Sequence, residues 1–287
     1  MKTISASFAK KCFKKRKKDS HKGENGKVLV VGGSSDYVGA PALAAMAGIA
    51  CMRTGVDLVT VLAPEKAGFV INSYSPNLVV KKVKGDFFAP VHMKKILEES
   101  RKADVVLIGN GIGLNPKTVK LVRSVVGKIK APIVLDADGI KACKGMRFKG
   151  NVVVTPHKKE FEIFSGKKIS GSKDSSRGIS KLAKIVKAVA AKQMCIVLLK
   201  GRIDIISDGR EVLLNRTGCE AMTAAGTGDV LAGIVTALVA KKNPLVDAAA
   251  TGAYVNGLTG ERVAKRIGYS LVASDLIEEL PSTIKKM

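Results

Sequence analysis

The sequence of 287 residues has no tryptophan, only 4% aromatic residues, and three histidines. Aromatic rings supply the stacking surfaces of single-stranded nucleic-acid sites, so their scarcity argues against such a site. The histidines His21, His92 and His157 are far apart in the sequence, which argues against a multi-histidine metal centre. Long apolar runs are also missing, because none reaches the roughly 18 residues that a membrane-spanning helix needs. We expect neither membrane insertion nor base stacking.

The cysteines are few, and their spacing forms no known pattern. They are odd in number and contain no C-x-x-C pair: Cys12, Cys51, Cys143, Cys195 and Cys219. A scattered, odd set fits neither a disulfide scaffold nor a zinc module, and it is typical of a reducing compartment. We therefore expect a cytoplasmic protein.

Acidic residues are scarce relative to basic ones. The chain has 24 Asp and Glu against 49 Lys and Arg, a formal net charge of +25, and ten of the basic residues lie in the first thirty positions. This charge suits polyphosphate ligands as well as nucleic acids, although a solvated lysine-rich surface explains most of it. We expect residues 1–22 to form a basic tail, either a short helix or disordered. A single domain is expected over residues 23–287.

The rest of the chain alternates short β-branched runs with longer helical patterns. Strands are predicted at Lys27–Val31, Asp57–Leu62, Leu78–Val83, Asp104–Ile108, Ile133–Asp136, Val152–Thr155 and Ile196–Lys200. Helices are predicted at Pro41–Arg53, Val91–Lys102, Pro116–Lys128, Lys158–Ser165 and Lys173–Lys192, with three more after Asp229. Strands that are apolar at every position are typical of parallel sheets buried on both faces. The pattern predicts an α/β fold with an open, mostly parallel sheet and helices on both faces.

One segment breaks the alternation. The runs Ile203–Ser207 and Arg210–Leu214 flank Asp208-Gly209. An Asp-Gly pair between two apolar runs predicts a β-hairpin with a type I′ turn. We expect this hairpin to extend the sheet as an antiparallel edge.

Small and polar residues gather where the predicted strands end. Ligands of open α/β sheets bind beyond the carboxyl ends of the strands. The segments at these ends are 32–41, 109–113, 136–138, 156–157 and 200–201, and residues 225–229 open a later helix. The first loop lacks the Lys-Ser/Thr of a Walker A motif, and no G-x-G-x-x-G fingerprint is present. A nucleotide crevice is therefore predicted that is neither a P-loop nor a dinucleotide fold.

The most informative motif is Gly226-Thr227-Gly228-Asp229, ahead of an apolar helix over Val230–Ala240. Glycines at a helix start leave backbone N–H groups open to a phosphate, and the helix dipole favours negative charge there. An aspartate at that point can take the proton of a hydroxyl that attacks phosphorus. The alternative is that Asp229 only caps the helix, which is worth about 1 kcal/mol. The flanking glycines favour a catalytic Asp229.

Two other groups stay open at this level. His157 is the only histidine in a predicted strand-end loop, yet it also fits a helix start with Glu160 in the first turn. Asp136 and Asp138 fit either turn residues or water-mediated magnesium ligands.

Taken in order, these motifs resemble the NAD(P)H-hydrate dehydratase family of the ribokinase-like superfamily. The resemblance covers roughly Gly26 to Pro281, whereas Gly-Thr-Gly-Asp alone indicates only the superfamily. The motifs that carry it are Gly32-Gly33, Tyr37-x-Gly39-Ala40, Gly109-x-Gly111-x-Gly113, Asp136-Ala137-Asp138, Thr155-Pro156-His157-x-x-Glu160 and Gly226-Thr227-Gly228-Asp229-Val230-Leu231-Ala232-Gly233.

The resemblance implies a ribokinase-like fold and an activity in metabolite repair. Such enzymes use ADP or ATP, with Mg²⁺, to dehydrate the S epimer of NADHX or NADPHX to NADH or NADPH. Carried over by motif, the substrate contacts are Ala40, Gly113, His157 and Asp229. The carried-over nucleotide contacts are Lys200, Gly201, Arg202, Ile203, Asp204, Gly226, Thr227 and Gly228.

The same resemblance predicts the partners. Small-molecule substrates and a homo-oligomer are expected, and a chain of this length has no room for the epimerase domain that many relatives carry, so a separate epimerase is expected. The main alternative is a kinase of the same superfamily that phosphorylates a small alcohol such as a vitamin precursor. A basic nucleic-acid-binding protein is a more remote alternative, because it leaves the ordered glycine loops unexplained.

Overall fold

The computed structural model describes residues 1–35, 39–169 and 175–287. Tyr37 of the sequence motif and the expected helix start at Lys173 lie outside these ranges. The described chain forms one ten-stranded sheet in the order β1-β10-β9-β8-β7-β6-β5-β2-β3-β4. The strands are β1 (Lys2–Thr3), β2 (Lys27–Val31), β3 (Leu58–Pro64), β4 (Val79–Val83), β5 (Val105–Ile108), β6 (Ile133–Leu135), β7 (Val152–Val154), β8 (Ile196–Leu199), β9 (Asp204–Ser207) and β10 (Val212–Asn215).

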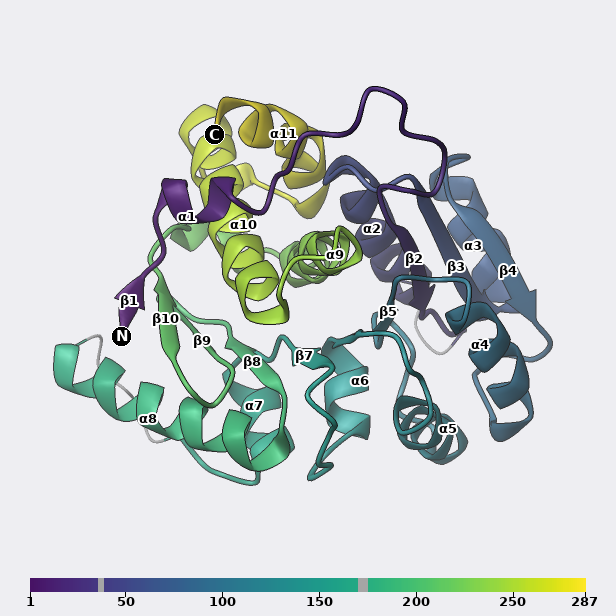
Figure 1. Cartoon of the computed structure of the whole chain (residues 1–287). Helices are drawn as coiled ribbons and strands as arrows, with labels where there is room; N and C mark the ends of the chain where they lie inside the picture. The colour runs from purple at the N-terminus through teal and green to yellow at the C-terminus, as the bar shows by residue number, and fades with distance from the viewer. Residues whose placement is uncertain (36–38, 170–174) are drawn as a thin grey trace.

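Helices cover both faces of the sheet, as predicted (Figure 1). One face carries α1 (Ala6–Lys10), α2 (Ala40–Arg53), α3 (Glu65–Tyr74), α9 (Thr227–Ala240), α10 (Leu245–Ile267) and α11 (Ala273–Lys286). The other carries α4 (Met93–Ser100), α5 (Pro116–Val126), α6 (Ala137–Ala142), α7 (Lys158–Ser165) and α8 (Ser176–Gln193). The described residues also form three short 3₁₀ helices, η1 (Pro90–His92), η2 (Glu220–Thr223) and η3 (Gly268–Ser270). None of the helices in the described ranges is long and apolar enough to cross a bilayer.

The sheet separates two hydrophobic cores. In β2, Val28 and Val30 pack into the core on the α9 face, and Leu29 and Val31 pack into the core on the α5 face. Alternate side chains of a strand point to opposite faces, so a strand that is apolar throughout fills both cores. The seven predicted parallel strands are thereby confirmed as β2 to β8.

Helix α9 lies in the middle of its layer, between α2 and α10 (Figure 1). Its residues from Asp229 to Ala240 are all buried. At Gly233 an added Cβ would collide with the carbonyl oxygen of Ala47 in α2. The missing side chain lets the two backbones approach closely, and this crossing fixes the direction of α9 relative to the sheet.

The predicted hairpin is confirmed as β9 and β10, but its turn is different. Ser207 pairs with Val212, so the loop has four residues rather than two. A type I′ turn needs positive φ at both central residues, and Gly209 has a φ of +89° whereas Asp208 is outside the left-handed region. Asp208 Oδ1 instead accepts the N–H groups of Arg210 and Glu211 at 2.8 and 2.9 Å. These side-chain hydrogen bonds stabilise the longer loop.

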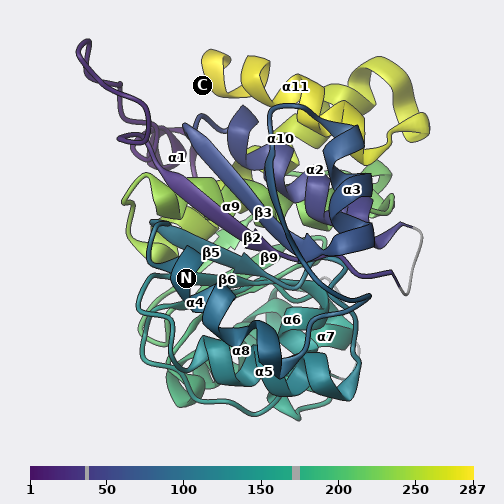
Figure 2. The same ribbon diagram turned by 90° about the vertical axis from the view of Figure 1, so that its right-hand side faces the viewer.

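The hairpin also does not form the edge of the sheet, because the N-terminal segment covers it. β1 pairs in parallel with β10, and Ile4, Ala9 and Cys12 are buried in the core. The expected basic tail over residues 1–22 is therefore partly built into the fold, because its few apolar side chains pack into the core beside β10 and α10. Beyond Cys12 the chain crosses the helical layer to β2 and projects from it (Figure 2).

Candidate active site

Four polar side chains follow four neighbouring strands. Asn110 comes after β5, Asp136 after β6, Thr155 after β7 and Lys200 after β8. These strands are adjacent and parallel. Because the carboxyl ends of parallel strands meet at one edge of a sheet, the topology brings the four side chains together.

The four side chains and Asp229 form one hydrogen-bonded network. Asn110 Nδ2 donates to Asp229 Oδ1 at 2.7 Å and to Asp136 Oδ2 at 3.0 Å. Asp136 Oδ1 accepts the hydroxyl of Thr155 at 2.7 Å, and it lies 3.3 Å from Lys200 Nζ. The network therefore links Asp229, in the first turn of α9, to Lys200, which follows β8.

The backbone at this edge is unusually close-packed. An added Cβ on Gly109 would collide with the carbonyl oxygen of Asp136. Ala137 has a φ of +46°, in the left-handed region that costs a residue with a side chain about 1–2 kcal/mol. Such conformations persist where the surrounding structure enforces them, and they are concentrated at functional sites.

The first turn of α9 differs from a simple capped helix. Gly226 is the N-cap, with a φ of +89°, and Asp229 is the third residue of the helix. The carboxylate of Asp229 accepts a hydrogen bond from Asn110, in the loop after β5, and the N-cap is Gly226, so the interpretation of Asp229 as only a helix cap is wrong. The N–H groups of Thr227 and Asp229 donate to Ala224 and Gly226 at 3.5 and 3.0 Å. Within the described chain Gly228 N–H has no such backbone acceptor, and it is the donor best placed for an anion.

Burial and neighbouring charge shift the pKa values of the central pair. Burial first, and the nearby Asp136 second, raise the pKa of Asp229 from 3.8 to about 7, against the hydrogen bond from Asn110 and the charge of Lys200. Burial acts to lower the pKa of Lys200, but the carboxylates of Asp136, Glu160 and Asp229 outweigh it and raise that pKa. Asp229 thus titrates near neutrality within the field of a cationic lysine whose own hydrogen bond goes to Asp136, a combination that is typical of catalytic sites.

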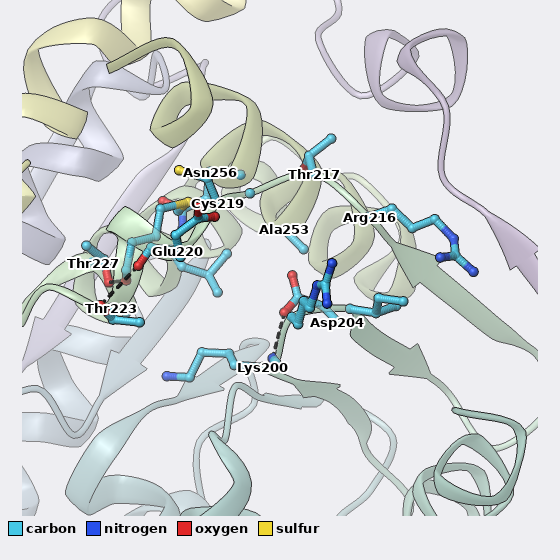
Figure 3. Close-up of a pocket in the computed structure, with 18 residues that line it drawn as sticks. Lys200, Asp204, Arg216, Thr217, Cys219, Glu220, Thr223, Thr227, Ala253 and Asn256 are labelled. Carbon is cyan, nitrogen blue, oxygen red and sulfur yellow. Dashed lines mark hydrogen bonds between the residues drawn. The ribbon is translucent and has the colours of Figure 1, made fainter. Parts of the chain in front are cut away.

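A cavity of about 940 Å³ opens next to this network. Its lining comes from the β8–β9 segment, the chain after β10, the start of α9 and the middle of α10: Lys200, Gly201, Arg202, Ile203, Asp204, Arg216, Thr217, Gly218, Cys219, Glu220, Met222, Thr223, Thr227, Gly228, Leu231, Ala253, Asn256 and Gly257. Figure 3 shows Asp204 on one side and Thr223 and Thr227 on the other, with Lys200 extending between them. The cavity has the size and charge of a site for a phosphorylated ligand.

One carboxyl group is held inside this cavity wall. Asp204 Oδ1 accepts the N–H of Gly201 at 3.0 Å, and Asp204 Oδ2 accepts the amide of Asn215 at 2.9 Å. Burial raises the pKa of Asp204 to about 6 in spite of these hydrogen bonds and of Lys200. These contacts fix the turn that shapes one side of the cavity.

The structure divides the carried-over residues into two groups. Seven of the eight nucleotide residues line the cavity, and Gly226 does not. Three of the four substrate residues, Gly113, His157 and Asp229, do not line this cavity. The side chain of Ala40, the first residue of α2, lies outside the part of the chain that the structure describes. Gly113 N–H donates to Asp138 at 3.2 Å, and Asp229 belongs to the network described above.

His157 has a structural role that the sequence left open. Its Nδ1 accepts the N–H groups of Lys159 and Glu160 at 3.1 and 3.3 Å, and Glu160 Oε2 accepts the N–H of His157 at 2.9 Å. His157 and Glu160 thus form a reciprocal cap at the start of α7. The ring is half exposed, so the cap does not occupy the whole side chain.

The aspartates proposed as magnesium ligands have separate partners. Asp136 is taken up by Asn110, Thr155 and Lys200, and Asp138 pairs with Lys141 at 2.9 Å. In the part of the chain that the structure describes, no group of three or more His, Cys, Asp or Glu side chains is placed to hold a metal ion.

Sequence reasoning missed several parts of the site. It did not single out Asn110, although a polar residue between two glycines was a signal. It also missed the wall formed by α10, where Ala253 and Gly257 are small and the Oδ1 of buried Asn256 has no hydrogen-bond partner among the described residues. A lone amide in a helix face of small residues was the available signal there.

A family model described as NAD(P)H-hydrate dehydratase matches residues 28–282. The chain belongs to this family.

Relatives in the family agree with this assignment. The chain is 40% identical over 273 residues to the bifunctional NAD(P)H-hydrate repair enzyme of Pyrobaculum aerophilum, covering 94% of this chain and 53% of that protein. It is 38% identical over 288 residues to the ADP-dependent (S)-NAD(P)H-hydrate dehydratase of Nitrosopumilus maritimus, covering 99% and 97%. The chain therefore spans about half the length of the bifunctional relative and nearly all of the other.

Among solved structures, the fold is similar to that of the ADP/ATP-dependent NAD(P)H-hydrate dehydratase of Bacillus subtilis, which was co-crystallised with ATP and Mg²⁺. The TM-score is 0.83 at 25% identity, covering 99% of this chain and 98% of the other. The ribokinase-like α/β fold predicted from the sequence is confirmed.

Proposed function

We propose that this protein catalyses the ADP- or ATP-dependent dehydration of the S epimer of NADHX or NADPHX to NADH or NADPH. The observation that carries the proposal is the position of Asp229. It is a buried carboxyl group at the first turn of α9, linked through Asn110 and Asp136 to Lys200 in the wall of a nucleotide-sized cavity.

In this mechanism Asp229 is the general base. Its carboxylate takes the proton of the ring hydroxyl, and the hydroxyl oxygen attacks the terminal phosphorus of the nucleotide. The bond from that phosphorus to the bridging oxygen breaks, and the shortened nucleotide leaves. The carbon–oxygen bond of the new phosphate ester then breaks, a proton leaves the neighbouring ring carbon, and inorganic phosphate departs as the ring double bond of the dihydropyridine is restored. Because a base must be ionised, activity is expected to rise as the pH passes the raised pKa of Asp229, about 7.

Charge in the transferring group is stabilised by the protein as well. Gly228 N–H and the ammonium group of Lys200 border the cavity where the phosphates would lie. Mg²⁺, bound through the nucleotide phosphates, would neutralise part of the charge that develops on the phosphoryl oxygens. Lys200 stays protonated because three carboxylates surround it.

The remaining expectations are part of the same proposal. We expect the chain to act on the S epimer alone, and a separate epimerase to convert the R epimer. The five cysteines are free, in keeping with a reducing, cytoplasmic location. A homo-oligomer is proposed because apolar side chains are exposed on α3 and on the neighbouring edge strand β4: Phe69, Val70, Tyr74 and Val79. Light scattering of the purified protein tests that state.

The direct test is a product assay. The purified protein is mixed with S-NADHX, Mg²⁺ and either ADP or ATP, and the absorbance of the reduced nicotinamide is followed together with the release of phosphate. The proposal predicts that both rise in equal amounts. Under the alternative of a small-alcohol kinase, no absorbance returns and a stable phosphorylated alcohol is formed from some other substrate. R-NADHX serves as the matched control and should remain unchanged until an epimerase is added.

A further inference from the structure

Asn110 lies at the centre of the polar network and is fully buried. Its amide nitrogen donates to two carboxylates, Asp229 at 2.7 Å and Asp136 at 3.0 Å. An ionised carboxylate only accepts hydrogen bonds, so the NH₂ group, not the oxygen, must face the pair. Asn110 therefore bridges the two acidic side chains by hydrogen bonds. Because it lies between them, it also keeps the two carboxylates apart.

The backbone fixes Asn110 from two sides. Its carbonyl oxygen accepts the N–H of Gly33 at 2.9 Å, and an added Cβ on Gly32 would collide with that same oxygen. On the other side, Gly109 approaches the backbone of Asp136 too closely to carry a side chain. The glycines of two separate loops thus hold this one residue in place.

The other half of the Asn110 amide is unsatisfied. Its Oδ1 is buried and has no hydrogen-bond partner among the described residues. Asn215, which is equally buried, has its Oδ1 bonded to Thr217 N–H at 3.2 Å and to the Thr217 hydroxyl at 2.9 Å. An unpartnered buried acceptor lowers stability. A contribution to stability therefore does not explain why an asparagine stands at position 110, whereas a role in the site does.

We propose that Asn110 is the positioning residue for the base, holding Asp229 Oδ1 in place and keeping the Asp229 carboxylate apart from Asp136 during proton transfer. This inference rests on the proposed function, in which Asp229 takes the substrate proton. Asn110 acts through Asp229, so its loss should alter how that carboxylate titrates as well as how fast the enzyme turns over.

The direction of the change follows from the groups that face Asp229. The hydrogen bond from Asn110 and the charge of Lys200 favour the ionised carboxylate, while burial and Asp136 disfavour it, and Glu160 acts on the same Lys200. Replacing Asn110 by alanine removes one stabilising contact and leaves the two acidic groups unseparated. Both effects raise the pKa of Asp229.

The experiment compares Asn110→Ala and Asn110→Ser with the wild type. The acid limb of the pH profile of kcat/KM should move up by about one pH unit or more, since a hydrogen bond to a charged group is worth at least that much. At neutral pH kcat should fall roughly tenfold or more, while KM for the nucleotide changes little. The carboxyl carbon of Asp229, observed by NMR without substrate, should titrate at the same raised pH.

Asn243→Ala is the matched control. Asn243 is a buried asparagine beyond the far end of α9, where its amide donates to Cys12 and Leu238 carbonyls at 3.2 and 2.9 Å. This variant should lose stability but keep the wild-type pH limb. If Asn110→Ala does not fold, Asn110→Ser, whose hydroxyl is too short to reach both carboxylates, is interpreted in the same way.

The outcomes separate the two hypotheses. An acid limb and an Asp229 titration that stay at their wild-type pH in the Asn110 variants overturn the role of Asn110, even if the enzyme is a dehydratase. If the wild type does not dehydrate S-NADHX, the proposed function fails. The NMR titration then still decides whether Asn110 controls the Asp229 carboxylate.

Discussion

Replacing Asp229 by asparagine should make the protein more stable above neutral pH. Asp229 is 8% exposed. Burial and Asp136 raise its pKa from 3.8 to about 7. The folded protein therefore binds this proton more tightly than the unfolded chain does. Below the ordinary value the group is protonated in both states, and above about 7 it is ionised in both, so the stability of the wild type falls between these two pH values.

The magnitude follows from the size of the interval. Raising the pKa of Asp229 by about three units lowers the free energy of unfolding above neutral pH by roughly 4 kcal/mol, at about 1.4 kcal/mol for each unit. Asparagine is neutral and avoids this cost, although its NH₂ group needs an acceptor of its own. We expect Asp229→Asn to gain roughly 2–4 kcal/mol near pH 8 and almost nothing near pH 4.

Urea denaturation of the wild type and Asp229→Asn across this pH range measures the difference. Asp19→Asn, at an exposed position in the N-terminal segment, is the control and should show no pH-dependent gain. A variant that is less stable than the wild type near pH 8, or whose gain does not depend on pH, would refute the claim that Asp229 is a destabilised buried carboxylate.

Three other substitutions test separate parts of the structure. A Cβ at Gly228 would lie 3.1 Å from Lys200 Nζ, so Gly228→Val should raise the KM for the nucleotide by roughly tenfold or more. An unchanged KM would mean that the nucleotide does not bind at the start of α9. His157→Asn keeps a side chain that can cap α7, so the stability of this variant should stay within about 0.5 kcal/mol of the wild type. If His157 contacts the hydrate, the KM for the hydrate rises, whereas an unchanged KM would mean that His157 only caps the helix. Glu99 is buried, which alone raises its pKa, but Lys81, Lys102 and Lys95 lower that pKa to about 2. Glu99→Gln should therefore cost roughly 1–3 kcal/mol at neutral pH, and the cost should vanish as the pH falls from about 4.5 towards 2, whereas a loss that is equal at both ends contradicts the ion-pair explanation.

The sequence predicted most of the sheet because its strands are apolar on both faces. Lys27–Val31 was predicted with the bounds that the structure gives. The prediction of the hairpin turn was wrong because the Asp208 side chain, which a dipeptide rule ignores, accepts the N–H groups of Arg210 and Glu211 and favours a four-residue loop. Helix α3 was not predicted, since its face of Phe69, Val70 and Tyr74 is exposed and breaks the amphipathic pattern.

The N-terminal segment shows a different limit. Its lysines predicted a tail, but burial depends on where a few apolar side chains find space, and Ile4 and Cys12 find it beside β10 and α10. Arg16 then fixes the crossing, with its guanidinium 3.1 Å from Asp57. Such long-range contacts have no local signature in the sequence.

The site was predicted residue by residue only where a motif marked it. The glycine-framed Asp229 and the Lys200–Asp204 run were found in that way, and the latter lines the cavity. Asn110 takes its importance from the order of the strands, which places it between Asp136 and Asp229. Spacing along the chain, about 26 and 119 residues apart, does not reveal such a neighbourhood.

The most direct test of the central claim is the turnover of S-NADHX by Asp229→Asn, measured together with the binding of ADP. With Asp229 as the base, turnover falls by at least ~100-fold while the affinity for ADP stays close to that of the wild type. Near-normal turnover in this variant would contradict the claim that Asp229 takes the proton.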